Sequence, residues 1–200
     1  MTSATELDSI TSLTTNLNLR NAFNGETFIF PDVQNDPMET RFRCILDKGG
    51  SGGGNALVHI HPLADETFEV KSGRIAVVIE GYENIVEAGR SVTVTRGTPH
   101  YFKNGGDEIA EMVIRFTPAQ NHQEFFINFA TLVEKKPRWF SAKGDPNFLL
   151  ITLVLHTYRN HLYLAGVPII LQKFLFACLA PIARLRGYRL EILPRDSIQT

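Results

Sequence analysis

Between Glu26 and Phe116 the chain is divided at short, regular intervals by Gly, Pro, Asn or Asp. The runs between these turn residues are rich in β-branched and aromatic side chains, which favour strands. They are Thr27–Phe30, Thr40–Leu46, Ala56–Ile60, Thr67–Val70, Ile75–Glu80, Glu83–Val86, Ser91–Thr95 and Ala110–Phe116. No helix of useful length fits before residue 120. Short strands at regular spacing predict a β-sandwich or β-barrel for this part of the chain.

A different periodicity begins after residue 120. Apolar residues recur at helical spacing in 125–133. Asp145 and Pro146 form a typical helix start before the apolar run 148–158. Another helix is predicted over 169–183. The chain is therefore predicted to be mainly β, with helices at its C-terminal end.

The composition argues against a disordered, secreted or nucleic-acid-binding protein. With 44% hydrophobic and 20% charged residues, the chain can bury a sizeable core. Cys44 and Cys178 provide neither a disulfide framework nor a CxxC pair, and residues 1–20 lack the features of a secretory signal. We therefore expect a cytoplasmic location. No basic-aromatic surface typical of nucleic-acid binding is evident in the sequence, so we expect no nucleic-acid partner.

Charge is distributed unevenly along the chain. Residues 1–134 carry a net charge of −8, whereas residues 135–200 carry +7. One interpretation is that the two halves pack together and neutralise each other. The other is that the basic half meets a membrane surface or an acidic ligand, since charge imbalance bears on association more than on fold.

The stretch Leu162–Ala183 is apolar over most of its length. Three arrangements are consistent with it: helices that cover the barrel or a dimer partner, an interfacial helix flanked by arginines, and a membrane span. Pro168, Pro181 and the central Gln172–Lys173 pair oppose a span. We expect helices that pack on the barrel, or on the partner's barrel in a homodimer.

Side chains suited to metal binding lie close together in the sequence. His59 and His61 are two positions apart on a predicted strand, so both project from the same face. Glu66 follows a turn that begins at Pro62, and its carboxylate reaches the imidazoles if the chain doubles back. Such ligands, with open positions, suit a divalent metal such as Fe, Mn, Ni, Co or Zn. A further candidate, His100, follows a Gly-x-Pro turn at the start of another predicted strand.

The residues around these candidates resemble the two sequence motifs of the cupin family. The first motif corresponds to Gly53, His59, His61, Glu66 and Gly73. The second corresponds to Gly89, Gly97, His100 and Asn104, with Thr95 where the family usually has proline. The resemblance covers roughly residues 40–118 and leaves the C-terminal tail outside the family core.

The resemblance implies a double-stranded β-helix, the jelly-roll barrel of the cupins, followed by a C-terminal α-helical segment. Residues 1–25 are then an N-terminal arm, 26–119 the barrel and 120–200 a helical extension. The resemblance further implies that one divalent transition metal is bound inside the barrel by His59, His61, Glu66 and His100.

Strand alternation indicates which other side chains face such a metal. Phe68 lies two positions after Glu66, and Phe102 lies two positions after His100, so each aromatic ring is expected on the same strand face as the ligand candidate. Both rings are therefore expected to line a substrate pocket. Arg43 is a candidate for binding a substrate carboxylate, the alternative being an exposed strand arginine. The remaining histidines, His122, His156 and His161, are expected to be ordinary polar residues with no role in the site.

Two classes of function are consistent with such a barrel, because cupin folds host many activities. The first is a metal-dependent enzyme that acts on a small apolar or aromatic organic molecule by oxygenase, isomerase, cyclase or lyase chemistry. The second is a non-catalytic ligand-binding or sensor protein, peripheral to a membrane through its basic, apolar C-terminal helices. The intact set of ligand positions favours the enzyme.

Overall fold

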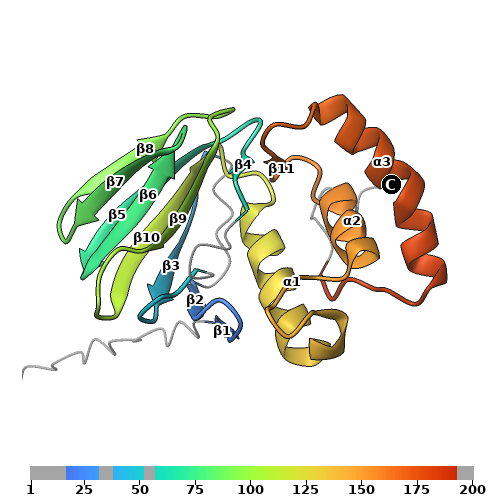
Figure 1. Ribbon diagram of the computed structural model, residues 1–200, viewed down its shortest axis with the longest axis horizontal. Helices are drawn as coiled ribbons and strands as arrows, with labels where there is room; N and C mark the ends of the chain where they lie inside the picture. The colour runs from blue at the N-terminus through green and yellow to red at the C-terminus, as the bar shows by residue number, and fades with distance from the viewer. Residues whose placement is uncertain (1–16, 32–37, 52–56, 193–200) are drawn as a thin grey trace, which may run out of the picture.

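Two antiparallel sheets face each other and form a jelly-roll barrel, and the C-terminal helices stand against one end of it (Figure 1). This computed structural model describes residues 17–31, 38–51 and 57–192. The architecture confirms the predicted fold class, a mainly β double-stranded β-helix followed by a helical segment.

The six-stranded sheet has the order β1-β2-β3-β10-β5-β8, and the five-stranded sheet has the order β11-β4-β9-β6-β7. The first contains β1 (Leu17–Asn21), β2 (Glu26–Phe30), β3 (Thr40–Leu46), β10 (Ala110–Thr117), β5 (Asp65–Ser72) and β8 (Ser91–Val94). The second contains β11 (Tyr163–Leu164), β4 (His59–Ile60), β9 (His100–Asn104), β6 (Arg74–Ile79) and β7 (Tyr82–Glu87).

Alternation along the strands separates the interior of the barrel from its outer surface. In β3, Phe42 and Cys44 are buried, whereas Arg41 and Arg43, which alternate with them, are exposed. The same alternation in β5 and β10 fills the interior mainly with aromatic and aliphatic side chains. Period-two alternation is what a sheet with one solvated face requires, which is why the strands could be predicted.

The six-stranded sheet begins inside the segment that was expected to be an N-terminal arm. β1 pairs with β2 in antiparallel register, from Leu17 opposite Phe30 to Asn21 opposite Glu26. Leu19 of β1 is buried in the main hydrophobic core. Residues 17–21 therefore form an edge strand of the barrel, and residues 1–16 of the expected arm lie outside the described residues.

The extension folds as α1 (His122–Lys135), the short 3-10 helix η2 (Pro137–Trp139), α2 (Phe148–Thr157) and α3 (Ile169–Leu185). α1 stands between the barrel and the other two helices (Figure 1). Phe126 of α1 packs against Phe28 and Phe42, with ring centroids 5.1 and 4.9 Å away. Because α2 is apolar on nearly every side, it is buried in a second hydrophobic cluster that includes side chains from α1 and α3.

Two helix boundaries differ from the predicted ones. Asn147, and not Asp145, caps α2: its side chain accepts a hydrogen bond from the Leu149 amide at 3.0 Å. Asp145 instead accepts a hydrogen bond from the Ser141 hydroxyl in the preceding turn. α3 continues through Pro181 to Leu185, and Gly187, at a φ of 89°, follows its end.

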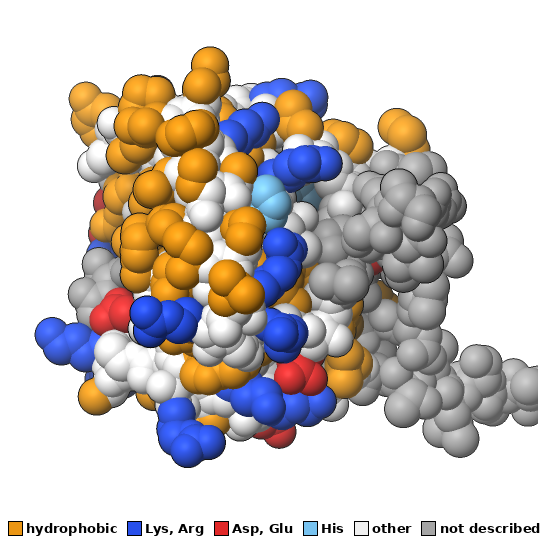
Figure 2. Space-filling model, turned by 90° about the vertical axis from the view of Figure 1, so that its right-hand side faces the viewer, with side chains coloured by type: hydrophobic (Ala, Val, Ile, Leu, Met, Phe, Trp, Pro, Cys, Tyr) orange, Lys and Arg blue, Asp and Glu red, His pale blue; other side chains and the backbone are white. Residues whose placement is uncertain are grey.

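α3 is the outermost helix, and its side of the molecule shows hydrophobic side chains beside Lys and Arg (Figure 2). Among the described residues, no helix combines the length and the apolar character that crossing a membrane requires. Between α2 and α3 the chain returns to the barrel as β11. This strand pairs with β4, so that Tyr163 lies opposite Ile60 and Leu164 opposite His59.

Candidate metal centre

The four ligand candidates come together inside the barrel. One donor atom from each of His59, His61, Glu66 and His100 lies within 4.8 Å of the others. His59 and His100 lie opposite each other where β4 pairs with β9, while Glu66 enters from β5 of the other sheet. The centre therefore lies between the two sheets, and three strands, β4, β5 and β9, contribute to it. Gly53, the first residue of the first motif, lies outside the described residues.

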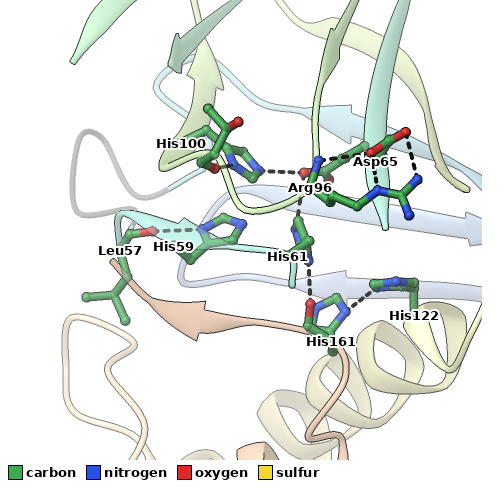
Figure 3. A network of polar contacts seen from close by, with 10 residues as sticks. Leu57, His59, His61, Asp65, Arg96, His100, His122 and His161 are labelled. Atoms are coloured by element: carbon green, nitrogen blue, oxygen red, sulfur yellow. Dashed lines mark hydrogen bonds and ion pairs between the residues drawn. The ribbon is translucent and has the colours of Figure 1, made fainter. Parts of the chain in front are cut away.

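Hydrogen bonds orient each imidazole ring of this cluster (Figure 3). The Nδ1 atoms of His59 and His100 lie 2.9 and 2.8 Å from the carbonyl oxygens of Leu57 and Thr98. The Nδ1 atom of His61 lies 2.5 Å from the carbonyl oxygen of His161. Because a carbonyl oxygen only accepts, each Nδ1 must carry the proton and donate it. In a neutral ring the Nε2 atom is then unprotonated and able to coordinate a metal, as metal-binding histidines require. Without a metal, the Nε2 atom of His100 shares a proton with Glu66, which lies 2.8 Å away.

The carboxylate of Glu66 lies at the middle of the cluster. Its Oε2 atom is 2.8 Å from Nε2 of His100 and 3.2 Å from Nε2 of His61. Burial opposes its ionisation, but the neighbouring imidazoles of His61 and His100 hold the pKa of Glu66 far below its ordinary value. The carboxylate is therefore ionised throughout the physiological range.

The histidines respond to this environment in opposite directions. Burial, followed by the charges of His61 and His100, lowers the pKa of His59 to about 3. For His100, burial favours the neutral ring, but the hydrogen bond and the charge of Glu66 outweigh it and raise the pKa. A metal ion at the centre would replace the proton shared between His100 and Glu66, since metal ligands must be deprotonated.

These residues fit a divalent metal ion. The Nε2 atom of His61 is buried and lacks a hydrogen-bond partner, although it faces the carboxylate of Glu66. An uncompensated buried nitrogen is costly, and coordination would satisfy it. Three imidazoles and one carboxylate form a donor set of intermediate softness, which suits Fe, Mn, Co, Ni or Zn.

A cavity of about 340 Å³ opens from the cluster toward the helices. His59, His61 and Glu66 line one end of it. Most of the remaining wall is apolar and comes from both the barrel and the extension, including Phe102, Phe125, Phe126, Phe129, Leu155 and Phe176. The extension therefore forms part of the wall of the cavity that leads to the ligand cluster.

Glu26 provides a second buried carboxylate in the same cavity. Its Oε2 atom accepts a hydrogen bond from the Asn21 amide, and its Oε1 atom accepts one from the Ser51 hydroxyl, both at 3.0 Å. Burial raises the pKa of Glu26 to about 7, and these hydrogen bonds only partly oppose the rise. One feature of the sequence could have indicated this residue: Glu26 lies two positions before Phe28 in β2, so both side chains point into the barrel.

The structure brings only part of the predicted substrate site to the cluster. Phe102 lines the cavity, and Phe68 is buried behind it with the ring centroids 5.1 Å apart. Arg43 is not brought there: it lies on the outer face of β3 and pairs with Glu111 at 2.7 Å. The reason is strand parity, since the inward positions of β3 are those of Phe42 and Cys44.

Two histidines of the extension belong to the site, so their interpretation as ordinary polar residues is wrong. His122 and His161 are both buried, with their Nδ1 atoms 2.6 Å apart, and the main chain of His161 holds His61. Burial lowers the pKa of both rings well below the ordinary value. No spacing in the sequence indicates this contact, because His61 and His161 are 100 positions apart.

Comparison with known proteins identifies the family of the barrel. The model of the cupin domain family matches residues 42–116. That range includes all four ligand candidates and ends at the last strand of the barrel. No curated protein matches the chain.

Solved structures that are similar to this chain, each with low sequence identity, include two that are described as cupins. Pac13, a nucleoside dehydratase from Streptomyces, is 20% identical with a TM-score of 0.43, over 54% of this chain and 80% of that one. A cupin-superfamily sugar phosphate isomerase from Silicibacter pomeroyi is 20% identical with a TM-score of 0.41, over 48% and 60%. The cupin domain of Schizosaccharomyces pombe Cnp3 is 17% identical with a TM-score of 0.40, over 51% and 69%. Residues 42–116 therefore match the cupin domain family, and they lie within a jelly-roll barrel, the fold that the resemblance to this family implied.

Proposed function

We propose that the protein is a metal-dependent cupin enzyme that acts on a small, largely apolar organic molecule. One observation carries this proposal. Three imidazoles, each held by a carbonyl at Nδ1, direct their Nε2 atoms toward Glu66 at the end of an apolar cavity. A merely structural cluster would not need all three rings in the same tautomer with their second nitrogen available.

The cavity limits the class of substrate. Aromatic and aliphatic side chains form most of its wall, so transfer of an apolar substrate from water is favourable. Polar groups are concentrated at the ligand cluster and at Glu26, which lines the same cavity. A molecule with an apolar body and one or two oxygen substituents would satisfy both regions.

The residues of this chain suggest how a reaction would proceed. His59, His61, Glu66 and His100 would hold a metal that acts as a Lewis acid on a substrate oxygen. Glu26 would accept or donate a proton, since its pKa of about 7 allows both protonation states near neutral pH. Phe125, Phe126 and Phe129 of α1 would position the apolar body and exclude water.

Metal analysis of purified variants tests the proposal. We expect about one divalent transition metal per chain in the wild-type protein, and loss of most of it in His59→Ala and Glu66→Gln. His156→Ala is the matched control, because His156 lies on α2 and is not part of the cluster. Full occupancy in a double variant, His59→Ala with His61→Ala, would contradict the metal assignment.

A second measurement separates an enzyme from a binding protein. The metal-loaded protein is incubated with a panel of small aromatic and aliphatic carbonyl compounds, under air and under nitrogen, and products are detected by mass spectrometry. Conversion that is lost in Glu66→Gln supports the enzyme, and its oxygen dependence distinguishes redox from non-redox chemistry. Binding without conversion of any compound supports the ligand-binding or sensor alternative.

A further inference from the structure

The outward face of α3 is apolar, and no element of the described residues covers it. Gln172, Phe176, Ala180 and Ala183 form its buried side. Its exposed large hydrophobic side chains are Ile170, Leu171, Phe174, Leu175, Ile182 and Leu185. Ile170 is 84% exposed and Leu185 is 87% exposed, values that are unusual for isoleucine and leucine on a single helix. The exposed residues recur along the whole helix, so the patch is continuous rather than scattered.

Cations border this apolar face. Lys173 and Arg184 are about three turns apart on the same edge of the helix, and Arg186 follows on the other edge. Figure 2 shows the resulting surface, on which Lys and Arg side chains flank hydrophobic ones.

The segment of the chain that contains α3 carries no acidic side chain. Between Asp145 and Glu191 the sequence holds no Asp or Glu. The same segment holds five cations: Arg159, Lys173, Arg184, Arg186 and Arg189. A partner for this face must therefore combine an apolar interior with negative charge at its border.

We propose that α3 lies in the plane of an anionic membrane surface, with its apolar face among the acyl chains and its cations at the headgroups. A helix with a broad apolar face bordered by Lys and Arg is what interfacial binding requires. A second copy of this chain is a poorer partner, because packing α3 on α3 would bring like charges together without acidic residues to pair with them. Anionic lipid offers both complementary features at once.

Vesicle flotation of the full chain tests this proposal. We expect co-flotation with vesicles of phosphatidylcholine and phosphatidylglycerol at low salt, weaker binding at high salt, and little binding to phosphatidylcholine alone. Phe174→Glu should weaken binding by about tenfold or more. Tyr82→Glu is the matched control, because Tyr82 is 78% exposed on the barrel strand β7, and it should bind like the wild type.

Charge reversal tests the cations separately from the apolar face. The double variant Lys173→Glu, Arg184→Glu should bind at least about tenfold more weakly. The control Lys48→Glu, Arg90→Glu has the same net charge but changes exposed barrel residues, so it should retain binding. Equal loss in both variants would overturn the proposal, since it would show that only net charge matters.

A fluorescent label reports whether the face enters the lipid. Cys178 is exposed on α3, and Cys44 is buried, so a thiol-reactive, polarity-sensitive dye selects Cys178. Its emission should shift to shorter wavelength with anionic vesicles, whereas a dye at Tyr82→Cys in a Cys178→Ser background should not shift. The absence of a shift at Cys178, or a dimer in solution that Phe174→Glu converts to a monomer, would overturn the proposal.

Discussion

At the scale of single residues, two buried glutamates show how the surroundings of a carboxyl group determine its pKa. Glu66 faces imidazoles, and its pKa falls far below the ordinary range because the charged form is favoured. Glu26 faces only the neutral donors of Asn21, Ser51 and Asn24, so burial dominates and raises its pKa to about 7. Both lie in one cavity, so the site offers a permanent anion for binding a cation and a carboxyl group that titrates near neutrality.

The shifted pKa of Glu26 predicts a pH dependence of stability. A carboxyl group whose pKa rises from 4.5 to about 7 on folding binds its proton more tightly in the folded state. Its contribution to stability is therefore present below about pH 4.5 and is lost as the pH rises through 7. The loss should amount to about 3 kcal/mol of the free energy of unfolding.

Urea unfolding of the wild-type protein and of Glu26→Gln, between about pH 4 and pH 8, measures this effect. Glutamine does not titrate, so the free energy of unfolding of Glu26→Gln relative to that of the wild type should rise with pH. Parallel pH dependences in the two proteins would show that Glu26 does not titrate in this range.

At the scale of elements, the short strand β11 connects the helical extension to the metal ligands. The main chain of Leu164 lies opposite His59, and the carbonyl of His161 accepts the hydrogen bond from His61. Gln172 of α3 holds β11 in place: its amide accepts from the Leu164 amide at 3.0 Å and donates to the carbonyls of Leu164 and Val167. A single side chain thereby couples α3 to two of the four ligand candidates.

Replacing Gln172 should affect both stability and the metal site. Gln172→Ala removes the hydrogen-bond partner of three partly buried main-chain groups, so the free energy of unfolding should fall by about 1–3 kcal/mol. Because His61 and His59 lose their support, the dissociation constant for the metal should rise about 10- to 100-fold. Urea unfolding and competitive metal titration measure the two effects.

The neighbouring exposed residue provides the control for this prediction. Leu171→Ala lies next to Gln172 on the same helix, is 55% exposed and takes no part in the hydrogen bonds to β11, so it should change stability by less than about 0.5 kcal/mol. If Gln172→Ala lowers stability but leaves the metal affinity unchanged, the coupling of α3 to the ligands is contradicted.

At the scale of the whole molecule, the barrel and its extension share one continuous interior. Phe126 belongs to both hydrophobic clusters, since it packs against the barrel core and against the cluster around α2. α1 also contacts β1 and β3, and Phe116 of β10 stacks on the ring of His122, with centroids 3.9 Å apart. The extension therefore covers an end of the barrel that would otherwise present aromatic side chains to water.

Removing the extension should leave a barrel that is poorly soluble. A chain that ends at residue 120 uncovers the rings of Phe28 and Phe42 where Phe126 now packs. Complete exposure of one such side chain costs about 1.5–3 kcal/mol. We expect this truncated chain to aggregate or to bind a hydrophobic dye strongly. A chain that lacks only residues 193–200 is the control, and it should stay soluble; a soluble, cooperatively folded barrel would contradict the prediction.

Much of the barrel follows from local sequence patterns. The predicted runs Thr40–Leu46 and Ala110–Phe116 match β3 and β10 closely, because alternating burial imposes a period of two on the residues themselves. Other helix boundaries, such as the start of α2 after Asn147, depend on capping hydrogen bonds that residue propensities do not predict. The homodimer remains a prediction, for which light scattering in solution is the test.

The sequence by itself determined which side chains share a face and which residue types lie at ligand spacing. His59 and His61 could be selected because alternate positions of a strand share a face, and Glu66 and His100 because they match the two cupin motifs. Only the tertiary structure decided that Glu26 enters the same cavity and that His161 holds His61. Those relations join segments far apart in the chain, and they depend on how the extension docks against the barrel, which no local periodicity encodes.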